Sequence, residues 1–240
     1  MKHVCAAYFP KSPEEFEQGI DEHIINGIDF IEEVFLDRRF DTYLVRLAHS
    51  LKVEISERES RNALYASYIF HDLGKISRNY QESKSSFGGH EIISAYWISI
   101  HGNQLGLGEM LYPVMFSIYL HHHDIRKNSF KEVKRVNLCE SCLNLILDMY
   151  KKKTSIDLTT YKTELVGEIH SKLRDKFYQV ISNDREFKYF RLSYPLLQVV
   201  HGADNYSASI RRGGQTILSD EIQKVYKAIR FLREIFGRFD

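Results

Sequence analysis

The sequence has few residues that interrupt helices. Its 240 residues include only four prolines and 13 glycines, and no convincing alternation of polar and apolar residues is present. Apolar residues instead recur with the helical period, as at Ile20, Ile24 and Ile28. The pattern predicts an all-α fold of about nine or ten helices in a single compact domain over residues 1–240.

The expected helices are placed by the apolar period and by boundary signals. We expect them at residues 12–37, 42–51, 57–70, 90–102, 108–123, 138–153, 161–181, 189–210 and 219–239. Ser12, followed by Pro13 and Glu15, is typical of a capped helix start. Pro113 predicts a kink in its helix. Residues 51–56, with the sequence LKVEIS, are the best candidate for a strand.

The sequence also lacks a charge excess, a cysteine framework and a long apolar run. The net charge is +1, so any nucleic-acid binding must be local, weak or assisted by a partner. Three cysteines are too few for a disulfide framework, and the single CxxC, Cys139 to Cys142, is interpreted as helix packing rather than a four-ligand zinc site. No run approaches the roughly 20 apolar residues of a membrane span. We therefore expect a cytoplasmic protein with no membrane partner.

What the sequence does contain is a histidine and an aspartate at the end of an apolar helix. In the stretch LYASYIFHDLGKIS, His71 and Asp72 are followed by Gly74 and Lys75. Further metal-binding residue types fall where buried helices should converge: His23, His90, His121, His122 and Asp204. Each of these alone is more often a core or surface residue, but imidazoles and carboxylates gathered in this way indicate a metal site.

The order of these residues resembles the HD superfamily of metal-dependent phosphohydrolases. More narrowly, it is similar to the stand-alone HD nuclease of type I CRISPR interference. The segments that carry the resemblance are DEHIINGI, HDLGK, GGHEIISA, YLHHHDIR and GADNYSAS, between Ile20 and Ser209. The HD pair identifies only the superfamily, whereas HEIISA and the paired histidines favour the narrower family. The resemblance implies a compact helical HD-domain fold.

The resemblance also implies two divalent metal ions that share one carboxylate. The implied ligand sets are His23, His71 and Asp204 for one ion, and His90, His121 and His122 for the other. Asp72 would bridge the ions, and Lys75 would lie near the scissile phosphate. A register in which His122 and His123 replace His121 and His122 is the alternative. Imidazole-rich ligation favours manganese, nickel, cobalt or iron, with magnesium the less favoured choice.

The activity that the resemblance implies is hydrolysis of phosphodiester bonds in single-stranded DNA. The implied partners are a separate CRISPR-associated helicase subunit and a crRNA-guided effector complex. Arg211 and Arg212 would grip the phosphate backbone, although a solvated loop is the alternative. Other hypotheses are an HD nucleotide phosphohydrolase, a cyclic-dinucleotide phosphodiesterase, and a non-catalytic helical adaptor with a broken ligand set. His201, three residues before Asp204, is a candidate for positioning a ligand.

Overall fold

The computed structural model of the chain describes residues 5–10, 17–84, 88–122 and 132–211. Within these ranges the all-α prediction is confirmed. The α-helices are α1 (Ile20–Val34), α2 (Phe40–Ser50), α3 (Glu57–Ile69), α4 (Arg78–Ser83), α5 (His90–His101), α6 (Leu111–Leu120), α7 (Glu140–Thr154), α8 (Ile169–Ser182) and α9 (Phe187–Arg211). Three short 3₁₀-helices are η1 (Leu36–Arg38), η2 (Leu73–Ile76) and η3 (Gly108–Met110).

Two small antiparallel sheets complete the described structure. One pairs β1 (Ala6–Tyr8) with β2 (Gln18–Gly19), and the other pairs β3 (Arg135–Asn137) with β4 (Glu164–Val166). None of the helices in the described part of the chain is long and apolar enough to cross a membrane.

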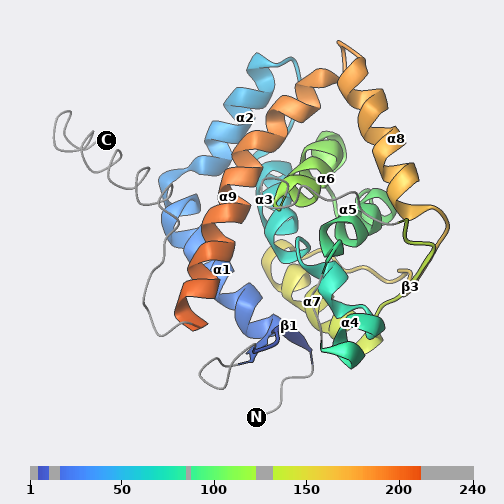
Figure 1. The fold of residues 1–240 in the computed structure, drawn as a ribbon. Helices are drawn as coiled ribbons and strands as arrows, with labels where there is room; N and C mark the ends of the chain where they lie inside the picture. Colours follow the sequence, from blue (N-terminus) through green and yellow to red (C-terminus); the bar gives the residue numbers. More distant parts are fainter. Residues whose placement is uncertain (1–4, 11–16, 85–87, 123–131, 212–240) are drawn as a thin grey trace.

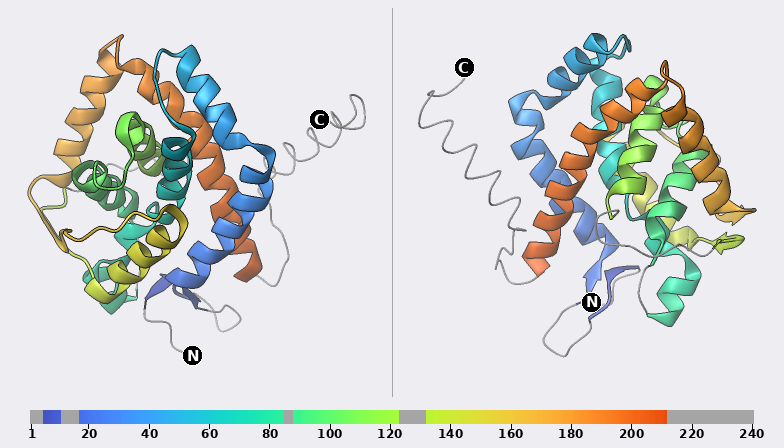
Figure 2. Two further views of the ribbon diagram at one scale, coloured as in Figure 1. Left: turned by 180° about the vertical axis from the view of Figure 1, so that it is seen from behind. Right: turned by 45° about the horizontal axis from the view of Figure 1, so that its top comes forward.

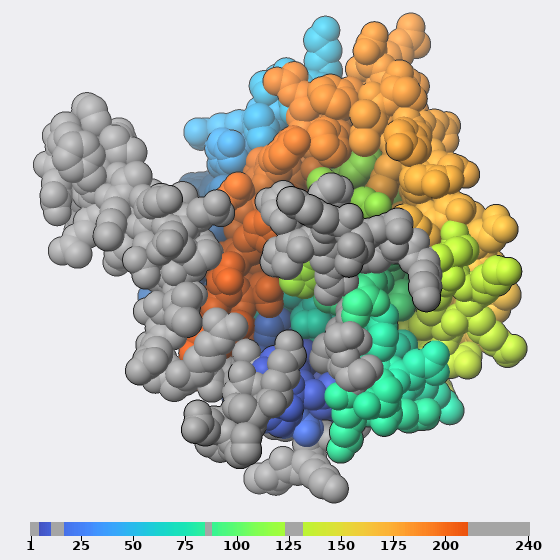
Figure 3. Space-filling view, in the orientation of Figure 1, coloured from blue at the N-terminus to red at the C-terminus, as the bar shows by residue number. Residues whose placement is uncertain are grey.

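Helix α9 crosses one face of the molecule and packs on α1, α3 and α6 (Figure 1). Helix α3 lies behind it, so that Leu64, Tyr68 and Ile69 are fully buried. Helices α6 and α7 pack on further sides of α3, and α5 packs on α6 and η2 (Figure 2). The buried apolar residues form one continuous core, and α8 and α9 lie on the molecular surface (Figure 3). The single domain over 1–240 includes residues outside the described ranges and stays a prediction.

Helix α3 begins at a reciprocal cap that the sequence encodes locally. The Ser56 hydroxyl accepts a hydrogen bond from the Glu59 N–H at 3.1 Å, and the Glu59 carboxylate accepts one from the Ser56 N–H at 2.8 Å. The cap satisfies N–H groups that have no partner inside the helix. The following buried run then ends at Phe70, which places His71 and Asp72 at the junction with η2.

Gly74 lets η2 lie directly against the start of α5. Its N–H donates to the Ser94 hydroxyl at 2.8 Å, and that hydroxyl donates to the His90 carbonyl at 2.9 Å. A Cβ atom at Gly74 would lie 2.2 Å from the His90 carbonyl oxygen, closer than any real contact. Only glycine therefore allows the approach that brings Asp72 close to His90.

The first predicted helix starts too early. Ser12 and Pro13 lie outside the described residues, but Gln18 and Gly19 form strand β2, and α1 begins at Ile20. Residues 18 and 19 are extended because they pair with β1 and because the Gln18 side chain donates to the Ser207 carbonyl at 3.2 Å. The sequence pattern could not show this contact between distant segments.

Several other local predictions are wrong in detail. Residues 51–56 form no strand, and 164–166 form β4, so that α8 begins at Ile169 rather than at 161. The segment 108–123 divides into η3 and α6, which places Pro113 in the first turn of α6. Proline is tolerated there because its missing N–H would have no helical partner. The predicted helix at 219–239 lies outside the described residues.

Two of the three cysteines form a disulfide. Cys142 is joined to Cys5 by a disulfide across 137 residues of sequence, which corrects the interpretation of the CxxC as helix packing alone. No local pattern predicts this pairing, because Cys5 and Cys142 lie in segments far apart in the sequence.

Replacement of Gly74 by alanine tests the close approach of η2 to α5. Because the new Cβ meets backbone rather than a flexible side chain, we expect Gly74→Ala to lower the free energy of unfolding by about 1–3 kcal/mol. Urea denaturation measures this change. Gly202→Ala in α9 is the control, since its Cβ would meet side chains and no backbone, namely the Phe30 ring at 3.1 Å and the Phe35 ring at 3.9 Å. Equal stability of Gly74→Ala and the unmodified chain would contradict the steric account.

Candidate metal centre

Seven polar side chains from separate segments converge behind α9. One group contains Asp72, His90, His121 and His122, and the other contains His23, His71, Asp72 and Asp204. Within each group the potential ligand atoms all lie within 4.8 Å of one another. The structure thus brings together every residue of the two expected ligand sets, and Asp72 belongs to both groups.

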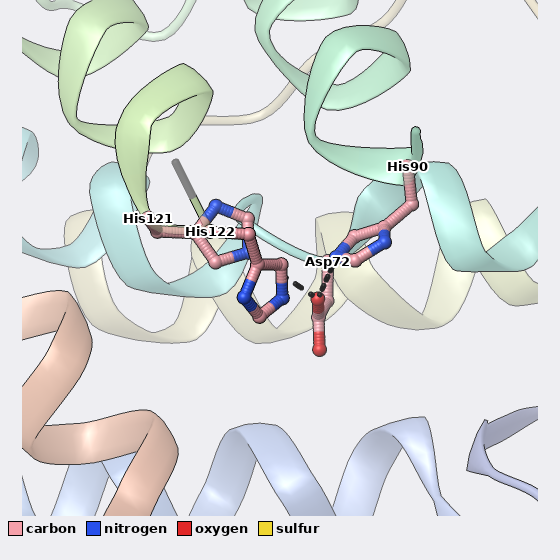
Figure 4. A group of neighbouring side chains, drawn as sticks. All are labelled: Asp72, His90, His121 and His122. Atoms are coloured by element: carbon pink, nitrogen blue, oxygen red, sulfur yellow. Dashed lines mark ion pairs between the residues drawn. The ribbon is translucent and has the colours of Figure 1, made fainter. Parts of the chain in front are cut away.

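The carboxylate of Asp72 faces the two groups with different oxygens. Its Oδ2 lies 3.4 Å from His23 Nε2 and 3.3 Å from His71 Nε2. Its Oδ1 lies 3.0 Å from His90 Nε2 and 3.9 Å from His121 Nε2, as the dashed lines in Figure 4 indicate. One buried carboxylate can therefore contribute an oxygen to each of two cations.

Asp204 reaches the first group from α9. Its Oδ1 lies 3.3 Å from His23 Nε2 and 3.7 Å from His71 Nε2. The Asp204 side chain is 27% exposed, whereas those of His71 and Asp72 are at most 1% exposed. The first group therefore opens towards solvent on the side of α9.

Backbone carbonyl groups orient two of the imidazoles. His71 Nδ1 lies 2.5 Å from the Tyr68 carbonyl oxygen, and His121 Nδ1 lies 2.5 Å from the Ile118 carbonyl oxygen. A carbonyl oxygen can only accept, so each Nδ1 carries a proton and each Nε2 faces the centre, where its lone pair can bind a cation once no second proton occupies it. This arrangement is typical of histidines that bind metal ions.

His23 is oriented by a side chain that the sequence analysis missed. The Ser207 hydroxyl donates to the His23 carbonyl at 3.0 Å and lies 3.0 Å from His23 Nδ1, from which its oxygen can accept. The Gln18 amide donates to the same hydroxyl at 3.3 Å. Ser207 lies three residues after Asp204 and so shares its helix face, a weak signal in the sequence. Nothing in the sequence pointed to Gln18.

Two further contacts support the second group. The carboxylate of buried Glu91 lies 3.4 Å from His90 Nδ1. His201 Nε2 lies 2.9 Å from the His121 carbonyl oxygen. His201 thus touches the backbone of a candidate ligand rather than the centre itself, and Glu91 was not singled out in the sequence.

The buried polar atoms of the centre fit divalent cations. His23 Nε2, His71 Nε2, Asp72 Oδ1 and His121 Nε2 are buried without a hydrogen-bond partner among the described residues. Such atoms usually cost about 1–3 kcal/mol each when nothing compensates them. In each of the two groups, lone pairs of imidazole and carboxylate converge. Divalent transition ions are commonly bound by such donors.

The carboxylates of the centre stay ionised despite their burial. Burial alone would raise the pKa of Asp72, but His71, Lys75 and the neighbouring imidazoles hold it well below its usual range. Burial acts in the same direction on Asp204, whose pKa is kept low by the imidazoles of His23 and His71. Both groups are therefore anions at neutral pH and can bind cations.

Three of the histidines differ in protonation. Burial would lower the pKa of His71, but the charge of Asp72 outweighs it and the pKa is raised. Burial lowers the pKa of His121 to about 4 and that of His122 to about 2. The imidazoles of His121 and His122 are therefore neutral and ready to donate lone pairs, whereas a cation in the first group must displace the proton of His71.

Lys75 contacts the carboxylate that the two groups share. Its Nζ lies 2.6 Å from Asp72 Oδ2, and its side chain is 15% exposed. Its role beside a scissile phosphate stays a prediction. Arg211 is the last residue of α9, and its side chain, like Arg212 and His123, lies outside the described residues. The nucleic-acid contact of Arg211 and Arg212 and the alternative histidine register therefore stay predictions.

Replacement of Asp72 tests whether one carboxylate serves both groups. Asp72→Asn keeps the size of the side chain and removes its charge, so we expect manganese affinity to fall by more than about tenfold at both sites. Metal content after dialysis and calorimetric titration measure this loss. Asp41→Asn is the matched control, because Asp41 is also a buried carboxylate but pairs with Arg61 at 2.5 Å outside both groups. Loss of only one ion from Asp72→Asn would contradict a shared ligand.

The raised pKa of His71 predicts that metal binding releases protons. Without metal, His71 is protonated at a pH below its raised pKa, so metal affinity should increase with pH until that pKa is passed. Calorimetry in two buffers of different ionisation enthalpy should show more protons released per ion at about pH 6 than at about pH 8.5. His49→Gln, at an exposed histidine outside the centre, should behave like the unmodified chain. A proton release that does not vary with pH would contradict the assignment.

The HD domain family model matches residues 38–158, half of the chain, and these include His71, Asp72, His90, His121 and His122. No curated protein matches. The chain resembles the CRISPR-associated Cas3 HD domain protein of Methanocaldococcus jannaschii with a TM-score of 0.52 and 16% identity, covering 76% of this chain and 95% of the other. At that identity the likeness shows a shared fold. The chain belongs to the HD domain family of metal-dependent hydrolases.

Proposed function

We propose that the chain is a metal-dependent nuclease that hydrolyses phosphodiester bonds of single-stranded DNA. The observation that carries this proposal is the Asp72 carboxylate, which faces one set of ligands with each oxygen. The narrower assignment to CRISPR interference is supported by the HEIISA and paired-histidine segments and by the fold shared with a Cas3 HD domain protein. The proposed partners are a separate helicase subunit and a crRNA-guided effector complex.

The residues that would hold two ions form two sets that share one carboxylate. His23, His71 and Asp204 would hold one, His90, His121 and His122 the other, with Asp72 shared. Two bound divalent cations supply an acidic water and neutralise phosphate charge in an in-line displacement. Nitrogen-rich ligation favours manganese, cobalt, nickel or iron over magnesium.

Backbone and side-chain groups of the protein would position the metal ligands for the reaction. The Tyr68 and Ile118 carbonyl groups hold the imidazoles of His71 and His121 in the tautomer that presents Nε2. Asp72, whose side chain is 1% exposed, keeps its charge because basic groups surround it. Rigid placement of these groups is the chain's contribution, because catalysis by bound ions depends on fixed coordination geometry.

Lys75 brings a positive charge to the edge of the centre. Its ammonium group contacts Asp72 and is more exposed than the carboxylate it neutralises. We propose that it contacts the non-bridging oxygens of the scissile phosphate, as ammonium groups commonly do at phosphates. Arg211 and Arg212 are proposed to hold the DNA backbone beyond the end of α9. Because the net charge is only +1, binding should depend weakly on salt, and a helicase would deliver the unwound strand.

One assay with three substrates tests the proposal. With added manganese, single-stranded DNA should be cleaved faster than deoxynucleoside triphosphates or cyclic dinucleotides, and EDTA should stop the reaction. Asp72→Asn should lower the rate by at least about 10³-fold because it removes the ligand common to both ions. Asp41→Asn should retain the rate of the unmodified chain.

The outcome separates the competing hypotheses. If nucleotides or cyclic dinucleotides are hydrolysed faster than single-stranded DNA, the chain is another HD hydrolase with the same metal chemistry, and the nuclease proposal is wrong. Absence of any hydrolysis by metal-loaded protein would instead favour a non-catalytic adaptor. Degradation of duplex DNA without a helicase would contradict the partner-fed mechanism.

A further inference from the structure

Three cysteines meet at a second place in the molecule, away from the histidine centre. Cys5 directly precedes β1, Cys139 is the N-cap of α7, and Cys142 is in the first turn of that helix. Their sulfur atoms all lie within 4.8 Å of one another. Cys5 and Cys142 are joined by the disulfide, and Cys139 Sγ lies 4.0 Å from Cys5 Sγ. Every cysteine of the chain therefore belongs to this group.

The backbone around the three sulfur atoms is fixed by hydrogen bonds. The Ile20 N–H donates to the Cys5 carbonyl at 2.9 Å, and the Cys139 N–H donates to the Ile76 carbonyl at 3.0 Å. The Gln81 side chain accepts from the Ala6 N–H at 3.0 Å and donates to its carbonyl at 2.9 Å. Strand β1 and helix α7 are thus each tied to the segment formed by η2 and α4, independently of the disulfide.

The chemistry of the group differs from that of the histidine centre. Thiolates are soft ligands that select zinc, whereas the other centre offers imidazole and carboxylate. In a tetrahedral zinc site with Zn–S bonds of about 2.3 Å, neighbouring sulfur atoms lie about 3.8 Å apart. The 4.0 Å between the sulfur atoms of Cys5 and Cys139 is close to that separation.

We propose that Cys5, Cys139 and Cys142 form a zinc site when the disulfide is reduced. A dithiol reductant would supply two electrons and two protons to the Cys5–Cys142 bond and would itself become a disulfide. One zinc ion then replaces the three thiol protons. The described residues supply three ligands, so the last tetrahedral position is open to water. The disulfide is the oxidised, metal-free state of the same site.

The site ties the start of the chain to the segment that carries the HD pair. Cys139 is hydrogen-bonded to Ile76, the last residue of η2, and Ser77 forms an isolated bridge with Leu138. Strand β1 also contacts η2. Zinc would therefore clamp β1, η2 and α7 together without contributing to the catalytic centre.

Cobalt(II) is the probe, because cobalt bound to thiolate has a near-ultraviolet charge-transfer absorption that imidazole and carboxylate ligands do not produce. The full chain, reduced and stripped of metal, should develop this absorption in proportion to cobalt up to one thiolate-bound ion. Added zinc should abolish it, since zinc binds thiolate sites more tightly than cobalt.

Two variants and the oxidised unmodified chain make the outcome decisive. Cys139→Ser leaves the disulfide-forming pair intact, so it should fold and should lose most of the absorption. His71→Ala should retain the absorption, because His71 belongs to the other centre. The oxidised unmodified chain should show none, since two of its three sulfur atoms are bonded to each other. No absorption from the reduced chain, or an equal absorption from Cys139→Ser, would overturn the zinc site and leave the disulfide alone.

Discussion

The negative charge of Asp72 is the constraint around which the centre is built. A carboxylate that is 1% exposed loses its hydration, and such a loss costs several kcal/mol unless cations or donors replace the water. The chain replaces it with Lys75 and with the imidazoles of His71 and His90. Several features bring these groups to one carboxylate. They are the rigid end of α3, the close contact of η2 with α5 at Gly74, the start of α5 and the end of α6.

The elements that carry the centre could be predicted from the sequence where the signal is local. The helices expected at 57–70 and 90–102 correspond to α3 and α5, because an apolar helical run is a local signal, whereas the Ser56 cap of α3 was missed and Ser56 was placed in a strand. The convergence of the ligands was inferred from a family pattern rather than from local signals, because no periodicity shows which helix ends meet. Strand β2 and the disulfide depend on contacts between segments more than 100 residues apart or on very short pairings, which single-sequence patterns do not contain.

The supporting residues were harder to find than the ligands. Ser207, Gln18 and Glu91 are ordinary polar residues whose roles arise only when the helices are packed. His201 was found because it shares a helix with Asp204, although its partner, the His121 carbonyl, lies on another helix. Residue type identifies donors of lone pairs, whereas the hydrogen bonds that orient them depend on tertiary packing.

The ion pair between Lys75 and Asp72 has a consequence for the order of assembly. Many small metalloproteins fold only when their ion arrives, because nothing else neutralises the ligands. Here an internal ammonium group, 2.6 Å from the shared carboxylate, acts as a resident counter-ion before any metal is present. Part of the negative charge of the centre is therefore neutralised by the chain itself, so that this neutralisation does not have to wait for an ion.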